Sequence, residues 1–185
     1  MQKKDYSPAI ENRVSLITVS DKYAANWLQW RSQESSQNHM PLIKSSTEDL
    51  KKRLLLCTSD LSDVLKSEYR WIVEFDGEAI GTVAASNTSW HSGYTEISYI
   101  LSETYQGQGL AKNAVSLMIE KIFQETDLYR IFATISSDNI RSWKLVERLG
   151  FIQEGILRQH YLINGNRVDQ MIYGLLRPEW ELNCS

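Results

Sequence analysis

The residues best suited to chemistry form a glycine-rich turn, Tyr105-Gln106-Gly107-Gln108-Gly109-Leu110-Ala111, between an expected strand and a long expected helix. Because Gly107 and Gly109 lack a Cβ, backbone N–H groups there can face a pyrophosphate at close range. The following helix adds its unpaired N–H groups and the positive end of its dipole. One helix terminus gives an anion only about 0.3–1 kcal/mol, so several aligned donors are needed. The turn supplies them, which predicts a phosphate-binding loop.

The spacing of this turn differs from that of two common phosphate-binding motifs. A dinucleotide fingerprint, G-x-G-x-x-G, would need a third glycine where Lys112 stands, and no G-x-x-x-x-G-K-[ST] loop occurs. Two glycines can also simply make a tight connection from strand to helix. The turn alone therefore leaves its function open.

A second polar pair opens the next expected helix. Asn139 and Ser142 are three residues apart, so both side chains share one face of that helix and can line one wall of a tunnel. An asparagine at the start of a helix is also a common cap. Both roles remain open for Asn139.

The elements that must position these residues follow from hydrophobic periodicity. Period two and β-branched residues predict strands over 14–17, 69–75, 79–85, 94–101, 130–136, 151–163 and 168–176, with hairpins at Asp76-Gly77 and Asn164-Gly165. Helical spacing predicts helices from Ser20 to about Arg31, from Ser46 or Thr47 to about Cys57, from Leu110 to Gln124 and from Asn139 to Leu149. The stretch 32–46 has no period and is expected to be a loop.

This order of elements predicts a mixed α/β fold in a single domain over residues 1–185, structured over about 10–180. About seven strands form a mostly antiparallel sheet, flanked by about four helices. The strand–helix–strand portion before the last helix requires one parallel crossover within that sheet.

Composition narrows the class of protein. A net charge of -3 gives no electrostatic reason to expect nucleic acid as a partner, and no run approaches the ~20 apolar residues of a membrane span. Cys57 and Cys184 lack the spacing of a disulfide framework or a metal site, so we expect no metal and a reducing, cytoplasmic setting. Cys57 is expected in a helix and Cys184 in a frayed tail, after a polar segment 1–13 at the other end. A monomer or a homodimer is equally compatible with the sequence.

The glycine-rich turn resembles the acetyl-CoA signature of the GNAT superfamily, [QR]-x-x-G-x-[GA], through Gln106, Gly109 and Ala111. Downstream, Asn139-Ile140-Arg141-Ser142 and Arg148-Leu149-Gly150-Phe151 are similar to the N-x-x-S and [KR]-L-G-F blocks of the subfamily that acetylates ribosomal-protein N-termini. Residues 154–158, 164–165, 169 and 173–180 resemble its closing hairpin and final strand. The first half of the chain resembles the family only in element order and in the strand Glu96-Ile97-Ser98-Tyr99.

The resemblance implies a GNAT-like sheet with one splayed parallel pair, and acetyl-CoA as the cofactor. It implies that a strand edge pairs with the pantetheine arm and that the turn holds the pyrophosphate. The cofactor-binding residues expected in this way are Ile100, Leu101, Ser102, Gln106, Gly107, Gln108, Gly109, Leu110, Ala111, Lys112, Asn113, Asn139, Ser142 and Arg148.

The resemblance also suggests catalytic groups. Many GNAT enzymes place a tyrosine seven residues after the corresponding asparagine to protonate the departing thiolate, but Val146 stands there, so Ser142 becomes the expected donor. Glu96 is the expected proton acceptor, through water, because it lies on the strand beside the cofactor. Tyr161 or His160 is an alternative acceptor, and strict alternation would let only one of them face the site. Five further residues could line the amine pocket or pack in the core: Trp27, Trp30, His39, Trp90 and His91.

The function implied is acetylation of a primary amine, with a protein N-terminus, such as that of a ribosomal protein, as the leading acceptor. A lysine with a pKa near 10.4 costs about 4 kcal/mol to neutralise at pH 7.4, whereas an α-amine at about 7.7–8.0 costs under about 1. The alternatives are a small-molecule amine (antibiotic, polyamine or amino sugar) and a non-catalytic protein that binds acyl-CoA.

Overall fold

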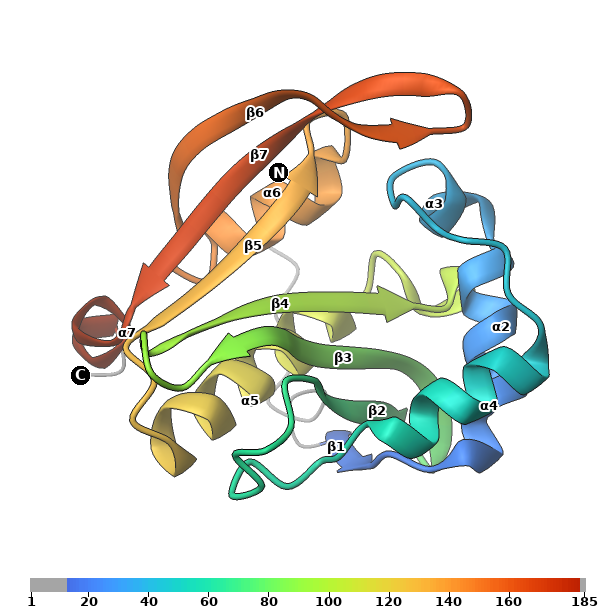
Figure 1. The fold of residues 1–185 in the computed structure, drawn as a ribbon, viewed down its shortest axis with the longest axis horizontal. Coiled ribbons are helices and arrows are strands. Elements are labelled where there is room, and N and C mark those ends of the chain that lie inside the picture. Colours follow the sequence, from blue (N-terminus) through green and yellow to red (C-terminus); the bar gives the residue numbers. More distant parts are fainter. Residues whose placement is uncertain (1–12, 184–185) are drawn as a thin grey trace, which may run out of the picture.

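The computed structural model describes residues 13–183 and contains one seven-stranded sheet (Figure 1). The expected features of residues 1–12, and Cys184 in the tail, lie outside the described residues. The strand order is β1-β2-β3-β4-β5-β7-β6. The strands are β1 (Val14–Thr18), β2 (Tyr69–Phe75), β3 (Glu78–Ser89), β4 (Tyr94–Leu101), β5 (Arg130–Ser136), β6 (Ile152–Ile163) and β7 (Asn166–Leu176). The predicted mixed α/β fold is confirmed.

Six α-helices accompany this sheet within the described residues, together with two short 3₁₀ turns. They are η1 (Asp21–Tyr23), α2 (Ala24–Ser32), α3 (Glu34–Gln37), α4 (Thr47–Leu56), η2 (Glu103–Tyr105), α5 (Leu110–Glu125), α6 (Ile140–Glu147) and α7 (Arg177–Asn183). The four predicted helices correspond to α2, α4, α5 and α6. Of the two residues predicted to open α4, Ser46 is the N-cap, and it forms a reciprocal capping box with Asp49.

Two short helices differ from the sequence prediction. Helix α3 lies inside the expected loop 32–46, and its Ser35 N–H is satisfied by Glu103 Oε1 at 2.8 Å, a cap that comes from a distant segment. Helix α7, which the sequence did not predict, begins directly after the predicted end of the last strand at Leu176. It forms because Leu176 N–H donates to Glu179 Oε2 at 2.8 Å and Pro178 occupies the first turn, where its missing N–H costs nothing.

The sheet contains one parallel pair, β4 with β5, and that pair is short. Only Tyr94↔Arg130, Thr95↔Ile131 and Glu96↔Phe132 are in register, and the strands then diverge (Figure 1). Every other neighbouring pair is antiparallel. The predicted splayed pair is therefore confirmed, and it opens a gap in the middle of the sheet.

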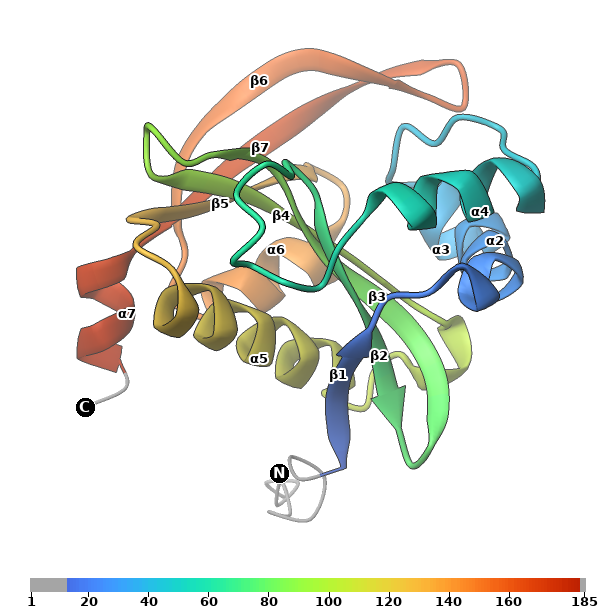
Figure 2. The ribbon, with the colours of Figure 1, turned by 60° about the horizontal axis from the view of Figure 1, so that its bottom comes forward.

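Alternation along the strands divides the core between the two faces of the sheet. Trp71 and Val73 pack with α5 on one face, whereas Ile72 packs with α2 and α4 on the other. On β4, Ile97 and Leu101 belong to the α5 face, while Ile100 belongs to the α2–α4 face. Figure 2 shows α5 and α6 apart from α2 and α4, with the sheet between them. The gap between β4 and β5 thus connects the face of the sheet that packs on α5 with the face that packs on α2 and α4.

Within residues 13–183, no helix combines the length and apolar character that a membrane span requires.

Candidate functional site

A cavity of about 970 Å³ occupies the gap between β4 and β5. That volume is at the upper end of the usual range for ligand pockets. Its walls fall into two groups, for which we use fixed names. The α5–α6 side consists of the turn 106–112 and residues 139–148, and the α3 side consists of residues 34–40 together with Ser136 and Asp138.

The turn before α5 has the geometry of an anion-binding loop. Gly107 and Gly109 have φ angles of +76° and +83°, which residues with a side chain rarely adopt. Gly109 is the N-cap of α5, no side chain caps that helix, and its first turn has no acidic residue. The first N–H groups of this 16-residue helix are therefore available to a ligand, and a Cβ built on Gly107 would meet nothing within 4 Å.

Cations gather on the same side of the cavity. Lys112 from α5 and three residues of α6 and its end line it: Arg141, Lys144 and Arg148. Carboxylates that line the cavity lie elsewhere, Glu34 and Asp138 on the α3 side and Glu103 on η2. An uncapped helix terminus with several nearby cations fits the phosphates of the expected acetyl-CoA.

The diverging part of β4 fits the rest of that molecule. Beyond Glu96 the strand has no β5 partner, so one edge of its backbone is free to pair with an extended ligand. Ile100 and Leu101 line the cavity there. Ser102 does not; it is buried, and its Oγ accepts a hydrogen bond from Gln33 Nε2 at 3.4 Å.

The predicted cofactor residues divide accordingly. The cavity is lined by Ile100, Leu101, Gln106, Gly107, Gly109, Ala111, Lys112, Asn139, Ser142 and Arg148. It is not lined by Ser102, Gln108, Leu110 and Asn113. Leu110 is 1% exposed in the core, and Gln108 Nε2 donates to Thr104 O at 3.2 Å. The cofactor roles of these residues remain predictions.

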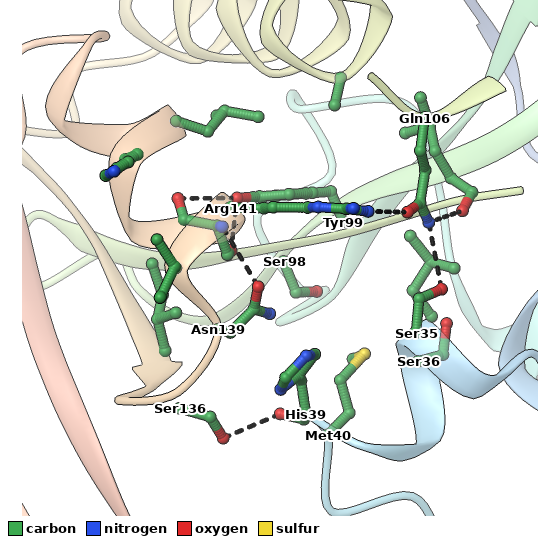
Figure 3. A pocket seen from close by; sticks show the side chains of 18 of the residues that line it. Ser35, Ser36, His39, Met40, Ser98, Tyr99, Gln106, Ser136, Asn139 and Arg141 are labelled. Carbon is green, nitrogen blue, oxygen red and sulfur yellow. Dashed lines mark hydrogen bonds between the residues drawn. The ribbon is translucent and has the colours of Figure 1, made fainter. Parts of the chain in front are cut away.

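Ser142 lies against a tyrosine that sequence reasoning missed. Tyr99 Oη and Ser142 Oγ are 2.6 Å apart (Figure 3), and burial raises the pKa of Tyr99 to about 12. Val146, at the position where many family members carry a tyrosine, is fully buried in the core. A phenol therefore reaches the cavity from β4 instead of from α6. The alternation along 94–101 places Tyr99 on the α5–α6 face, but only the fold brings it to Ser142.

Asn139 and Gln106 both make structural hydrogen bonds. Asn139 Oδ1 accepts the N–H of Ser142 at 3.2 Å, so it is a helix cap as well as a wall of the cavity. Gln106 Nε2 donates to Ser35 Oγ and to Leu101 O, both at 3.1 Å (Figure 3). Gln106 thus joins the glycine turn to α3 and to the end of β4.

Glu96 lies at the apex of the gap, where β4 and β5 last pair. Its Oε2 accepts from Asn87 Nδ2 at 2.7 Å and its Oε1 accepts from Thr134 Oγ1 at 2.6 Å. Thr134 lines the cavity, whereas Glu96 does not. Both carboxylate oxygens are therefore occupied by donors that tie three strands together, and its role as a proton acceptor stays a prediction.

The closing hairpin departs from strict alternation. The β6–β7 register shifts between Leu157 and Tyr161, and Gln159 has a φ of +51°. Strict alternation, the premise for expecting only one of His160 and Tyr161 to face the site, therefore does not hold here. The rings of His160 and Tyr161 contact each other, with centroids 4.6 Å apart. Neither residue lines the cavity.

The α3 side contains residues that the sequence left undecided. Ser35, Ser36, His39 and Met40 line the cavity, because α3 folds over the open end of the gap (Figures 1 and 3). His39 Nδ1 lies 3.3 Å from Asp138 Oδ1. No periodic signal marks this segment, so sequence alone could nominate only His39.

The tryptophans follow the packing alternative instead. Trp27 and Trp30 are 2% exposed in the core between α2, α4 and the sheet. Trp90 meets Tyr69 edge to face, with ring centroids 5.9 Å apart. His91 is exposed and does not line the cavity.

Comparison with known proteins agrees with this geometry. A putative ribosomal N-acetyltransferase of Bacillus subtilis is 31% identical over 107 residues, 58% of each chain. A spermidine N(1)-acetyltransferase of Escherichia coli is 34% identical over 100 residues, 54% of each chain. The match thus spans little more than half the length of these relatives. The crystal structure of a ribosomal-protein-S5-alanine acetyltransferase from Vibrio fischeri superposes with a TM-score of 0.78 at 26% identity, covering 91% of this chain and 95% of that one.

The match to a family model is longer than the match to either of these two sequence relatives. The model of the acetyltransferase (GNAT) domain matches residues 13–152, well over half of the chain. That range includes the splayed strands, the glycine turn and α6, which form the cavity. The chain therefore belongs to the GNAT family of acetyltransferases.

Proposed function

We propose that this protein is an acetyl-CoA-dependent N-acetyltransferase that acetylates a primary amine, with the N-terminal α-amine of a protein as its preferred acceptor. The observation that carries the proposal is the pair of hydroxyls, Tyr99 Oη and Ser142 Oγ, 2.6 Å apart on the wall of a cavity that opens between splayed strands. The pair lies on the same side of the cavity as the uncapped N-terminus of α5.

The residues of the α5–α6 side hold the acyl donor. The N–H groups at Gly107, Gly109 and the start of α5 bind the phosphates, and Lys112 and Arg148 neutralise their charge. Acetyl-CoA supplies the acetyl thioester. The free edge of β4 orients the chain that leads to it, in the manner of an added strand.

Ser142 and Tyr99 manage the proton of the leaving group. Ser142 Oγ holds a proton for the departing sulfur, and Tyr99 Oη can replace that proton across their hydrogen bond. Because the pKa of Tyr99 is raised to about 12, its hydroxyl stays protonated across the physiological range and remains a donor. Val146 cannot serve in this way, since it has no ionisable group and is buried.

An N-terminal amine needs less help from the site to lose its proton than a lysine does. Its pKa of about 7.7–8.0 leaves a useful neutral fraction at pH 7.5, whereas deprotonating a lysine with a pKa near 10.4 costs about 4 kcal/mol. The putative ribosomal N-acetyltransferase and the ribosomal-protein-S5-alanine acetyltransferase among the similar proteins support a ribosomal acceptor.

A polyamine is the second candidate. It is favoured by the similarity to a spermidine N(1)-acetyltransferase and by Glu34 and Glu103, two carboxylates that line the cavity. A polyamine carries several positive charges that such carboxylates would neutralise. Glu103, however, already accepts the N–H of Ser35.

A panel of acceptors tests both candidates through release of free thiol from acetyl-CoA. The matched pair is one peptide with a free N-terminus and no lysine, and the same peptide with a blocked N-terminus and one lysine; spermidine is the third member. We expect kcat/KM near pH 7.5 to favour the free N-terminus, and the preference over lysine to shrink toward pH 10. If spermidine is preferred over every peptide, the acceptor is a polyamine and not a protein N-terminus. If no amine is acetylated, a non-catalytic acyl-CoA-binding protein is favoured.

A further inference from the structure

A histidine and an aspartate meet on the α3 side of the cavity. His39 follows α3 and Asp138 lies between β5 and α6, 99 positions later. His39 Nδ1 is 3.3 Å from Asp138 Oδ1, and both residues line the cavity. The His39 side chain is 28% exposed, so one part of the ring is held while another is open. Figure 3 labels His39 among the residues that line the cavity.

The backbone of His39 is held as firmly as its ring. Its carbonyl accepts a hydrogen bond from Ser136 Oγ at 3.0 Å, and Ser136 Oγ in turn accepts one from Gln170 Nε2 at 2.9 Å. Ser136 and Gln170 are each 1% exposed. A buried polar network of this kind is committed to one geometry, so it fixes the backbone from which the imidazole extends.

The two hydroxyls and the imidazole approach the gap from opposite sides. Ser142 belongs to the α5–α6 side and Tyr99 Oη contacts it from β4, whereas His39 belongs to the α3 side. A reaction that takes a proton from one substrate and returns a proton to another needs an acceptor and a donor in separate places. The cavity provides both.

We infer that His39 is the proton acceptor for the incoming amine and that Asp138 is its positioning residue; the inference rests on the proposed function. A proton at Nδ1 directed to Asp138 leaves the lone pair of Nε2 available to the cavity. The ammonium proton of the acceptor passes to Nε2, and its nitrogen forms the N–C bond as the thioester C–S bond breaks. The nitrogen loses its second proton to solvent as the amide forms, and the sulfur takes the proton held at Ser142 Oγ. Ser142 regains a proton from solvent through Tyr99 Oη, and the imidazolium returns its own proton to solvent, so the reaction releases one proton overall.

Two other candidates for the same task are less well placed. Glu96 has both carboxylate oxygens engaged, by Asn87 and Thr134, and does not line the cavity. His160 is exposed on the closing hairpin, stacked on Tyr161, and also lies outside the cavity lining. Both are outside direct reach of an amine bound in the gap.

The three histidines of the chain allow a matched experiment. His39→Gln and His39→Ala are compared with His91→Gln and His160→Gln, using the amine that the wild-type protein acetylates best among the peptides and spermidine. A general base contributes about 10²–10⁴-fold, so kcat/KM should fall about 10²-fold in both His39 variants and stay near wild type in the other two. The acetyl-CoA Kd, measured by calorimetry, should be unchanged in all four.

Chemical rescue separates catalysis from packing. Added imidazole should restore part of the activity of His39→Ala, because the small base can occupy the space that the ring leaves, and should leave wild type unaffected. A loss of activity without rescue, accompanied by a lower Tm or weaker acetyl-CoA binding, would assign His39 to structure and overturn the inference.

Asp138 needs a readout of its own. Nitrogen-15 NMR of the His39 ring should show the proton on Nδ1 in the wild type and a shift toward the Nε2 tautomer in Asp138→Asn, together with a kcat loss smaller than that of His39→Gln. An unchanged tautomer would remove Asp138 from the role. Active wild type with fully active His39 variants would overturn the inference alone, whereas inactive wild type would overturn the proposed function and the inference with it.

Discussion

The two sides of the cavity are built in opposite ways. On the α5–α6 side the residues that line the cavity come from two short continuous segments, 106–112 and 139–148, and the groups available to a ligand include backbone N–H groups of a turn and a helix. On the α3 side the walls come from segments far apart in the chain, joined by side-chain hydrogen bonds such as those between His39 and Asp138 and between Ser136 and the His39 carbonyl.

This difference corresponds to two separate tasks, binding of the acyl donor and recognition of the acceptor amine. Binding a phosphate chain needs a conformation, which local sequence encodes through glycine and the start of a helix. Recognising a particular amine needs side chains in one place, which only tertiary structure provides. Substitutions on the two sides should therefore separate binding of acetyl-CoA from use of the acceptor.

The largest effect is expected from Gly109→Val. Gly109 has a φ of +83°, where a β-branched residue costs about 1–3 kcal/mol and shifts the N–H groups that begin α5. We expect acetyl-CoA affinity to fall about 10²-fold by calorimetry. Gly77→Val is the matched control, because Gly77 has a φ of +82° in the β2–β3 hairpin with open space around its Cβ position. Both variants should lose similar Tm, and an equal loss of affinity in the control would refute the loop assignment.

The next effect concerns Ser142→Ala, which removes the hydroxyl and leaves the helix cap intact, since Asn139 bonds the backbone of Ser142. We expect kcat to fall about tenfold while the acetyl-CoA Kd stays the same, because the loss is confined to proton return. Single-turnover measurements report this step directly. An unchanged single-turnover rate in the variant would show that Ser142 is not the proton donor to the thiolate, and would assign that role to Tyr99 alone or to water.

The sequence predicts the features that depend on local pattern and misses most of those that depend on tertiary contacts. The strands at 94–101 and 130–136 match β4 and β5 residue for residue, since period-two alternation is a local property. The glycine turn and the start of α6 were predicted for the same reason. The end of α6 was placed two residues late, at Leu149 rather than Glu147, a normal uncertainty at a fraying terminus.

Apart from α7, whose cap is local, the failures involve distant partners. Helix α3 depends on a cap from Glu103, 68 positions away, and the Tyr99–Ser142 pair joins residues 43 apart. The bulge at Gln159 depends on a hydrogen bond from its N–H to Asp169 on β7. No local pattern carries such information, so Glu96 came from a strand that lines the cavity but is not itself in the lining, and Tyr161 came from β6, which does not line it.

A smaller effect should follow from loosening the α3 side alone. Asn164, in the β6–β7 turn, donates from Nδ2 to Gln37 O at 3.3 Å and to Asn38 Oδ1 at 3.2 Å, which ties the hairpin to α3. Asn164→Gly removes these bonds and keeps the positive φ of +48° that the turn requires. We expect the KM for the amine to rise about threefold and the acetyl-CoA Kd to remain unchanged. A larger change in acetyl-CoA binding would show that the two sides are coupled through the hairpin.

The smallest effect concerns the ionisation of Tyr99. Burial raises its pKa to about 12, and burial together with Glu147 also raises that of Tyr173 to about 12. An unfolded tyrosine ionises near pH 10, so between about pH 10 and 12 the folded state keeps protons that the unfolded state has lost.

The stabilisation from each neutral phenol should therefore be complete below about pH 10 and decline as the pH rises toward 12. Spectrophotometric titration should show one fewer late-titrating tyrosine in either Tyr99→Phe or Tyr173→Phe than in the wild type. Only Tyr99→Phe should slow kcat, by a few fold, because only that hydroxyl contacts Ser142 in the cavity, whereas Tyr173 Oη bonds Glu147. If Tyr99 titrated near pH 10, its hydroxyl would be open to water, and proton return at Ser142 would not depend on a tyrosine from β4.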